Sequence, residues 1–168
     1  SNAGYEMARD YDNNPGFRIK DTIPPVLEAG ASTPSNNSSD FVISDSITIA
    51  FNESMNPTSM GGLYTGSGRT SCIGTIQLSK DDFINCVAFT SSTPSTSTPS
   101  VQNPFTNYTD FTVVPKVKLD LSTQYKIKVT TAAQDKYEHN LTSPMYINFK
   151  TIDPVQVQST NPPNGLTP

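Results

Sequence analysis

The sequence predicts an all-β fold, an antiparallel β-sandwich of about seven strands in two sheets. The first observation is alternation, because apolar residues occupy every second position in segments 47–51, 125–129 and 147–150. Such alternation is typical of a strand that has one buried face and one solvated face. The second observation is that long helical periodicity is missing from the chain. Several short half-buried strands bounded by turn residues indicate two stacked antiparallel sheets.

The strongest strand signal is segment 47–51, which runs directly into a polar turn that carries Met55 and Pro57. The same pattern predicts strands at about 26–32, 46–52, 74–79, 85–90, 110–115, 124–131 and 145–151.

Two segments interrupt this pattern. Residues 58–71 are rich in Gly, Ser and Thr and are expected to form a loop. Residues 90–104 form a low-complexity Ser/Thr/Pro tract, in which repeated prolines oppose both strand and helix. A surface loop of that length is either functional or disordered, and the scarcity of apolar anchors favours loose order.

A tyrosine at a strand start is a further sandwich signal. Tyr125 follows a bend that carries Leu119 and Leu121. This arrangement suits a tyrosine corner, in which the phenol bonds to upstream backbone and fixes the crossover between the sheets. An ordinary core tyrosine is the alternative.

Size and charge limit the classes of function. The chain has 168 residues, enough for one domain with flanking segments. A net charge of −4 and a pI near 4.8 argue against a nucleic-acid partner, because phosphate binding needs a basic patch. No apolar run approaches the roughly 20 residues that span a bilayer, so no membrane-spanning segment is expected.

The two cysteines, Cys72 and Cys86, lie close together in the sequence, with an apolar-alternating segment between them. Two thiols without nearby histidine or further cysteine cannot form a tetrahedral zinc site. We expect a local disulfide and therefore an oxidising compartment, with two unrelated free thiols as the alternative. Closing such a loop stabilises a fold by about 3 kcal/mol in the chain-entropy model.

An internal repeat indicates a tandem array. The phrase Thr-Ile-Pro-Pro-Val at 22–26 returns as Thr-Ile-Asp-Pro-Val at 151–155, and each copy precedes a Ser/Thr-rich stretch with a Pro-Asn turn. Residues 1–3 are interpreted as a cloning scar. We therefore assign residues 4–21 to a linker or the tail of a preceding module, 22–152 to the complete domain, and 153–168 to the start of the next module.

These motifs, in this order, resemble the bacterial Ig-like domain family, in particular the type repeated in S-layer and other bacterial surface proteins. Residues 21–26 are similar to the family's D-x-x-P-P-x-V opening, and 46–55 to its S-I-x-I-x-F-S-E-P-M strand and turn. Residues 121–129 resemble its L-x-x-x-T-x-Y-x-V-x-V segment. Residues 74–78 resemble the family's middle strand, and residues 133–140 with 149–151 resemble its closing A-x-D-x-x-G-N and F-T-T segments.

The resemblance implies an Ig-like module of a bacterial cell-surface or secreted multidomain protein, acting as a structural spacer and in adhesion. Its implied partners are neighbouring Ig-like modules of the same chain and a host matrix protein or glycan. An extracellular or cell-surface location is implied, with lipid anchoring through a missing N-terminal region as one form. Pro-rich junctions agree with the spacer role because they limit bending.

No catalytic residues are expected, so the chain is interpreted as not an enzyme. The one histidine, His139, lies in a polar turn and is interpreted as solvated, and no nucleophile-and-base motif is present. Glu53 is expected to bond nearby backbone more readily than a ligand. Two alternatives remain, a carbohydrate- or matrix-binding module that stacks sugars on Tyr64, Phe105 and Tyr108, and an accessory domain of a larger secreted enzyme.

The candidate metal ligands are Asp10, Asp12, Asn14 and Asp21. Oxygen-bearing side chains at alternate positions of a tight loop can supply several of the six to eight oxygens that calcium prefers. Pro15 occupies the position where an EF-hand needs glycine, and Asp/Asn-rich turns are common without metal. The hypothesis is a junctional calcium site that stiffens the array, and no other cofactor is expected.

Overall fold

Nine strands and one single-turn helix form the described part of the chain, which in this computed structural model is residues 21–62, 69–95 and 108–155. The fold is all-β, as the sequence predicts. In chain order the elements are β1 (Ser38–Phe41), β2 (Ile47–Ala50), the 3-10 helix η1 (Pro57–Ser59), β3 (Arg69–Thr70), β4 (Ile76–Ser79), β5 (Cys86–Val87), β6 (Phe89–Ser95), β7 (Asp110–Pro115), β8 (Gln124–Val129) and β9 (Met145–Thr151).

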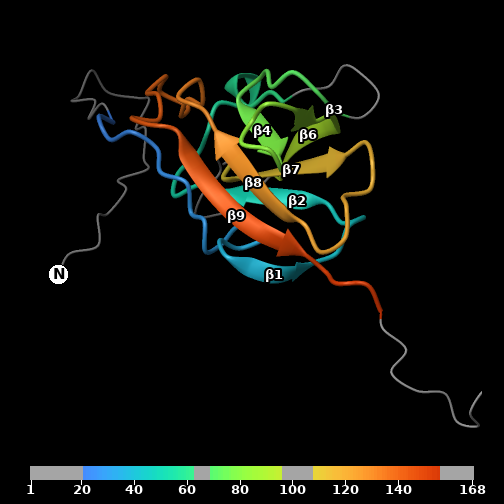
Figure 1. Ribbon diagram of the computed structural model, residues 1–168. Coiled ribbons are helices and arrows are strands. Elements are labelled where there is room, and N and C mark those ends of the chain that lie inside the picture. The colour runs from blue at the N-terminus through green and yellow to red at the C-terminus, as the bar shows by residue number, and fades with distance from the viewer. Residues whose placement is uncertain (1–20, 63–68, 96–107, 156–168) are drawn as a thin grey trace, which may run out of the picture.

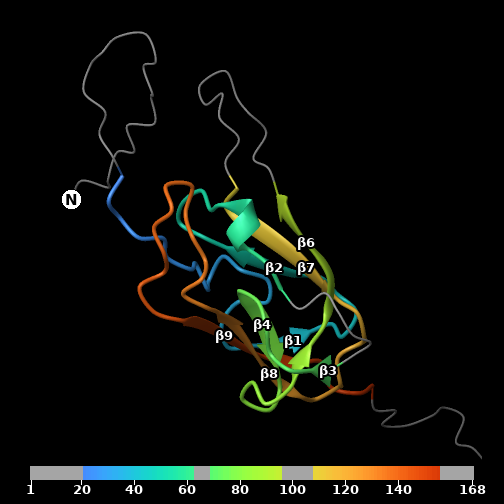
Figure 2. The ribbon, with the colours of Figure 1, turned by 90° about the horizontal axis from the view of Figure 1, so that it is seen from above.

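Two sheets are stacked as the layers of a sandwich (Figures 1 and 2). The first sheet has the strand order β1-β9-β8-β4, and the second has the order β2-β7-β6. A small ribbon of β3 and β5 lies beside them. Neighbouring strands are antiparallel except β1 and β9, which are parallel. This is the two-sheet arrangement that the alternating segments predict.

The core lies between the two sheets because every second residue of the facing strands points inward. Along β8 and β9 the cross-strand pairs Tyr125↔Phe149 and Ile127↔Ile147 are buried. Their counterpart in the second sheet is the buried pair Ile49↔Phe111. The Tyr125 and Phe149 rings stack with their centroids 5.8 Å apart. The alternation that predicted these strands is thus the pattern that fills the core.

Tyr125 forms the tyrosine corner that its position predicts. Its side chain is 2% exposed, and its hydroxyl oxygen accepts the backbone N–H of Asp120 over 3.1 Å. The bend is closed further by Thr151, whose hydroxyl donates to the Asp120 carbonyl over 2.6 Å. The corner therefore ties the connection before β8 to the end of β9.

The strand expected at 26–32 is wrong. That segment forms only isolated bridges near its ends, Leu27 to Phe51 and Thr33 to Thr48, with a hydrogen-bonded turn between them. The first strand is instead β1, which begins at Ser38. Its sequence Ser-Ser-Asp-Phe has one buried residue, so it lacks the alternation by which strands are recognised.

The expectation for residues 90–104 is wrong in its first part, because β6 continues to Ser95. Pro94, which pairs with Phe111 of β7, has no backbone N–H to donate to a further strand on the other side of β6. The strand order places β6 at the edge of its sheet, where proline is tolerated. Residues 96–107 lie outside the described residues. Within the expected loop at 58–71, η1 and β3 supply short regular pieces.

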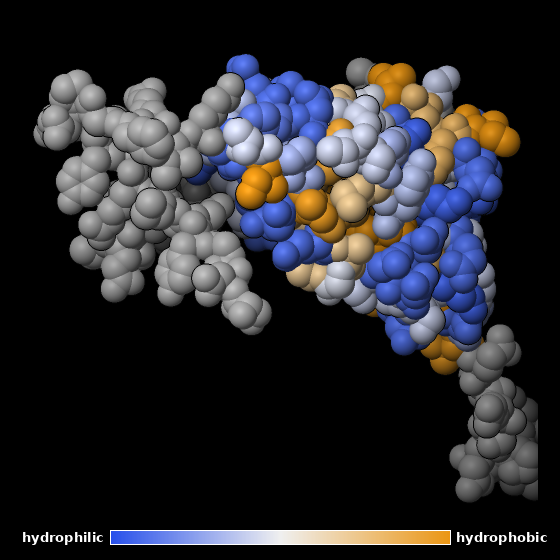
Figure 3. Space-filling view, turned by 90° about the vertical axis from the view of Figure 1, so that its left-hand side faces the viewer, coloured by the Kyte–Doolittle hydropathy of each residue, from blue (hydrophilic) through white to orange (hydrophobic). Residues whose placement is uncertain are grey.

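The described chain begins and ends at opposite ends of the sandwich. The blue start of the described chain lies at one end of the sandwich and its red exit at the other in both ribbon views (Figures 1 and 2). The face drawn in Figure 3 is mainly hydrophilic, with hydrophobic residues scattered among hydrophilic ones. No helix of the described residues is long and apolar enough to cross a membrane.

Candidate functional site

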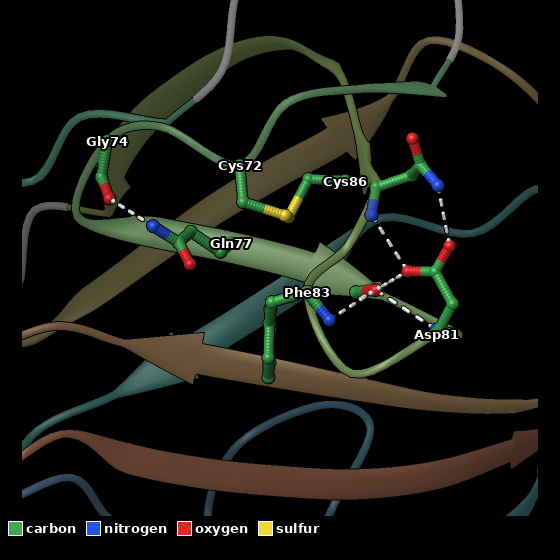
Figure 4. The surroundings of a disulfide bond; sticks show 8 residues. Cys72, Gly74, Gln77, Asp81, Phe83 and Cys86 are labelled. Atoms are coloured by element: carbon green, nitrogen blue, oxygen red, sulfur yellow. Dashed lines mark hydrogen bonds between the residues drawn. A yellow bond between two sulfur atoms is a disulfide. The ribbon is translucent and has the colours of Figure 1, made fainter.

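A disulfide joins Cys72 to Cys86, 14 positions apart in the sequence (Figure 4). The Cα atoms are 4.9 Å apart, and Cys86 is fully buried in β5. Of the two alternatives that the sequence left open, the structure has the bonded pair. The pairing of Thr70 with Cys86 in the β3–β5 ribbon brings the segments that carry the two cysteines together. The disulfide thus fixes this ribbon, whose strand β5 contacts the edge strand β4.

The turn between β4 and β5 is held by its own polar side chains (Figure 4). The Ser79 hydroxyl accepts the N–H groups of Asp81 and Phe83 over 3.1 and 3.0 Å and donates to the Asp81 carboxylate over 2.7 Å. That carboxylate also accepts the side-chain and backbone N–H groups of Asn85 over 2.8 and 2.9 Å. The Asn85 amide, followed by the Asn85 backbone and Ser79, lowers the pKa of Asp81 from 3.8 to about 2. The turn is therefore organised by an ionised carboxylate.

Two consecutive residues of this turn have a left-handed backbone. Asp82 has φ 52° and Phe83 has φ 67°, a conformation that costs roughly 1–2 kcal/mol for a residue with a Cβ. The side chain of Phe83 consequently leaves the turn toward the sheet and lies over β8 (Figure 4). Its ring packs beside the disulfide, and its centroid is 5.2 Å from the ammonium nitrogen of Lys128. Phe83 is not among the site residues that the sequence predicts. The one signal available is its position in the turn Asp-Asp-Phe-Ile-Asn between two expected strands.

A shallow polar pocket of about 210 Å³ lies on the outer face of the same sheet. Its lining includes Lys80 and Asp82 from the turn, Gln124 and Lys126 from β8, and Asn148 from β9. Lys126 forms an ion pair with Asp82 across the pocket. The pocket thus offers amide, ammonium and carboxylate groups together, which suits a hydroxylated ligand better than an apolar one.

Three carboxylates form an acidic cluster at the end of the sandwich where residue 21 lies. Oxygens of Asp21, Glu53 and Asp135 all lie within 4.8 Å of one another. Glu53 is 8% exposed and Asp135 is fully buried. A backbone bridge between Met55 and Asp135 brings the turn after β2 against the loop between β8 and β9. Glu53 and Asp135 are 82 positions apart, so no local sequence pattern could have predicted their meeting.

Of the four predicted calcium ligands, Asp21 therefore lies beside two further carboxylates. Asp10, Asp12 and Asn14 lie outside the described residues. Carboxylate oxygens are the ligands that calcium prefers, and the calcium site stays a prediction.

The interpretation of His139 as a solvated residue is wrong. Its side chain is 24% exposed, and its Nδ1 lies 2.8 Å from the buried Asp135 carboxylate. The other oxygen of Asp135 accepts the N–H groups of Tyr137 and His139 over 2.7 and 2.8 Å. Asp135 therefore organises its loop, and the imidazole is one of the groups that satisfy its charge.

Of the three aromatic residues expected to stack sugars, the structure describes Tyr108. Tyr108 is partly buried and packs against the core, so its ring is not a platform. Tyr64 and Phe105 lie outside the described residues. The exposed rings that the structure does describe include Tyr137 at 46% and Tyr146 at 45% exposure.

Comparison with known protein families matches the chain to the bacterial Ig-like domain over residues 21–151. The chain belongs to this family. The match covers all strands of the described sandwich, from β1 to β9, and it agrees with the family that the sequence motifs resemble. No curated protein matches the chain.

Among solved structures, this bacterial Ig-like domain resembles the crystal structure of the N-terminal part of the bacterial S-layer protein SbsC. The TM-score is 0.51 at 13% identity, and the match covers 79% of this chain and 24% of that one. A second structure of that protein, covering its domains 1–6, gives a TM-score of 0.49 at 12% identity over 80% of this chain and 14% of that one. At such identities the likeness shows the fold alone, and this chain spans about a quarter of the length of the first relative.

Proposed function

We propose that this domain is a non-catalytic spacer in a bacterial surface or secreted multidomain protein. The observation that carries the proposal is that the blue start and the red exit of the described chain lie at opposite ends of the sandwich (Figure 1). Modules connected in this way extend a chain end to end. The repeated opening phrase at 22–26 and 151–155 supports a neighbour of the same kind. The disulfide supports an oxidising, extracellular location.

The parallel pairing of β1 with β9 suits a domain that carries tension. Ser38 pairs with Phe149, and Phe41 pairs with Thr151 close to the exit of the chain. A pull on the two ends of the domain loads this parallel ladder in shear, so its bonds resist together instead of opening one at a time. The Phe41 and Phe149 rings, 5.0 Å apart edge to face, lie in the loaded region.

Stretching joined copies of the domain in a single-molecule experiment tests this role. We expect Phe41→Ala to lower the unfolding force, because it removes a buried ring from the β1–β9 contact. Val114→Ala, which truncates an exposed side chain of β7, is the matched control and should leave the force unchanged. Equal forces for wild type and Phe41→Ala would contradict the proposal that the β1–β9 pair resists the pull.

We further propose that calcium stiffens the junction at residue 21, with Asp21, Glu53 and Asp135 among the ligands beside the predicted Asp10, Asp12 and Asn14. The closeness of the three carboxylate oxygens, all within 4.8 Å of one another, favours this second role. Like charges at that separation repel, and a divalent cation relieves the repulsion.

Calorimetric titration of the chain with CaCl₂ tests the calcium proposal. Binding heat and a rise in Tm are expected, and both should diminish in Asp21→Asn. Asp45→Asn, which alters an exposed carboxylate away from the cluster, should bind as wild type does. Absence of heat, also in a longer protein that includes the preceding module, would exclude the site.

A further inference from the structure

The outer face of β8 and β9 carries an aromatic row beside a polar row, next to β4, whose outward residues Gln77 and Ser79 are buried. In the first row, Lys128 lies between Gln77 and Tyr146, its partners in the adjacent strands. Two positions along, Lys126 lies between Ser79 and Asn148. Residues two apart on a strand point to the same side, so both rows share one face and lie roughly 7 Å apart.

Phe83 adds a wall to the aromatic row. Its ring centroid is 6.1 Å from that of Tyr146, with an angle of 49° between the rings, and the Lys128 ammonium lies over its face. Phe83 has a left-handed backbone, its N–H donates to the Ser79 hydroxyl, and its side chain packs against the cluster of Cys86 and Ala88. Strained residues that the surroundings hold in place are concentrated at functional sites. The strain is therefore a reason to ask what this face binds.

We propose that this face binds an acidic saccharide, with one uronic acid residue over Tyr146 and Lys128 and a neighbouring sugar in the polar pocket. The apolar C–H face of a pyranose packs on an exposed ring such as Tyr146, which is 45% exposed. The pocket beside it presents the side chains of Gln124, Lys126 and Asn148 to hydroxyl groups. Its volume of about 210 Å³ lies below the usual range of about 300–1,000 Å³, which fits a single sugar unit.

Charge favours an acidic sugar over a neutral one. The other lysines of this face are matched by carboxylates, in the pairs Lys80–Asp120, Lys126–Asp82 and Lys150–Asp153. Among the described residues, no carboxylate forms an ion pair with Lys128, whose ammonium lies against the Phe83 ring. The carboxylate of a uronic acid supplies that missing anion at the aromatic row.

The same pocket disfavours an acidic peptide. A run of acidic side chains has neither the C–H face that packs on the Tyr146 ring nor the hydroxyl groups that the amides and the Asp82 carboxylate of the pocket bind. A spacer needs neither an exposed ring beside an ammonium group nor a polar pocket. The saccharide proposal therefore goes beyond the spacer role and is tested separately from it.

The experiment is an NMR titration of the ¹⁵N-labelled chain with trigalacturonate, the neutral galactotriose and a hexaglutamate peptide. Trigalacturonate should shift the amide resonances of Phe83, Lys128 and Tyr146, and it should bind about tenfold more tightly than galactotriose. Lys128→Gln should weaken trigalacturonate about tenfold and leave galactotriose unchanged. Tyr146→Ala should weaken both sugars, whereas Tyr146→Phe, which keeps the ring, should bind as wild type does.

The chain provides a matched control pair. Lys136 lies over the exposed ring of Tyr137, 4.9 Å from its centroid, in the loop between β8 and β9. Lys136→Gln and Tyr137→Ala remove the same chemical groups outside the proposed site and should leave binding unchanged. Any of three outcomes overturns the proposal: no shifts at the β8–β9 face, equal binding of the two sugars with no effect of Lys128→Gln, or binding of hexaglutamate without trigalacturonate.

Discussion

The hydroxyl oxygen of Tyr125 accepts the backbone N–H of Asp120 over 3.1 Å, which connects the start of β8 to the bend before it. Tyr125→Phe keeps the stacked ring and leaves that N–H without its acceptor. We expect the free energy of unfolding to fall by about 1 kcal/mol in urea denaturation. Tyr146→Phe, which removes a hydroxyl from an exposed ring, is the control and should change stability little. Equal stability of the two variants would contradict a tyrosine corner.

Reduction of the disulfide should destabilise the domain. The bond closes a loop with a sequence separation of 14, for which chain entropy predicts about 3 kcal/mol. Urea denaturation with and without dithiothreitol measures this difference. The double variant Cys72→Ala/Cys86→Ala should show no response to the reductant. A wild-type midpoint that also ignores the reductant would show that the bond does not constrain the unfolded chain.

Acid should weaken the turn that holds Phe83. Since the folded pKa of Asp81 is lowered from 3.8 to about 2, its contribution to stability is complete above pH 3.8 and is lost as the pH falls toward 2. Asp81→Asn lacks that titration. The stability difference between wild type and Asp81→Asn should therefore shrink over this interval, as measured by urea denaturation at successive pH values. Parallel pH profiles would refute the assigned role.

Gly74 should not tolerate a side chain. Its φ is +88°, and a Cβ there would lie 2.9 Å from the carbonyl carbon of Gly62. Gly74→Ala should therefore destabilise the domain by more than about 1 kcal/mol, because strain and the backbone clash add. Gly30→Ala is the matched control, since a Cβ at Gly30 meets nothing within 4 Å. Thermal unfolding of both variants checks the difference, and similar Tm values would contradict the close backbone approach.

The sequence predicts the strands whose burial alternates and misses those held by other means. β8 and β9 alternate cleanly, so their period of two is visible in the residues. β1 is mostly polar and is fixed by parallel pairing with β9, a contact between segments more than a hundred positions apart. β6 runs through a Ser/Thr/Pro tract because its edge position tolerates Pro94.

The candidate sites depend even more on tertiary contacts. The cysteines are close in sequence, so a local disulfide could be predicted. The acidic cluster joins Glu53 to Asp135 across the fold through the Met55–Asp135 bridge, which no spacing rule reveals. Phe83 has no periodic signal, because its direction comes from a left-handed backbone and not from a strand or helix period.

Small-angle X-ray scattering of a protein that contains two consecutive copies of the domain, residues 22–152, tests the spacer role most directly. With entry and exit at opposite ends and Pro-rich junctions between modules, the maximum dimension should be about twice that of one copy. The scattering curve should have the form expected for a rod. A compact particle, with a maximum dimension near that of a single copy, would contradict the spacer role.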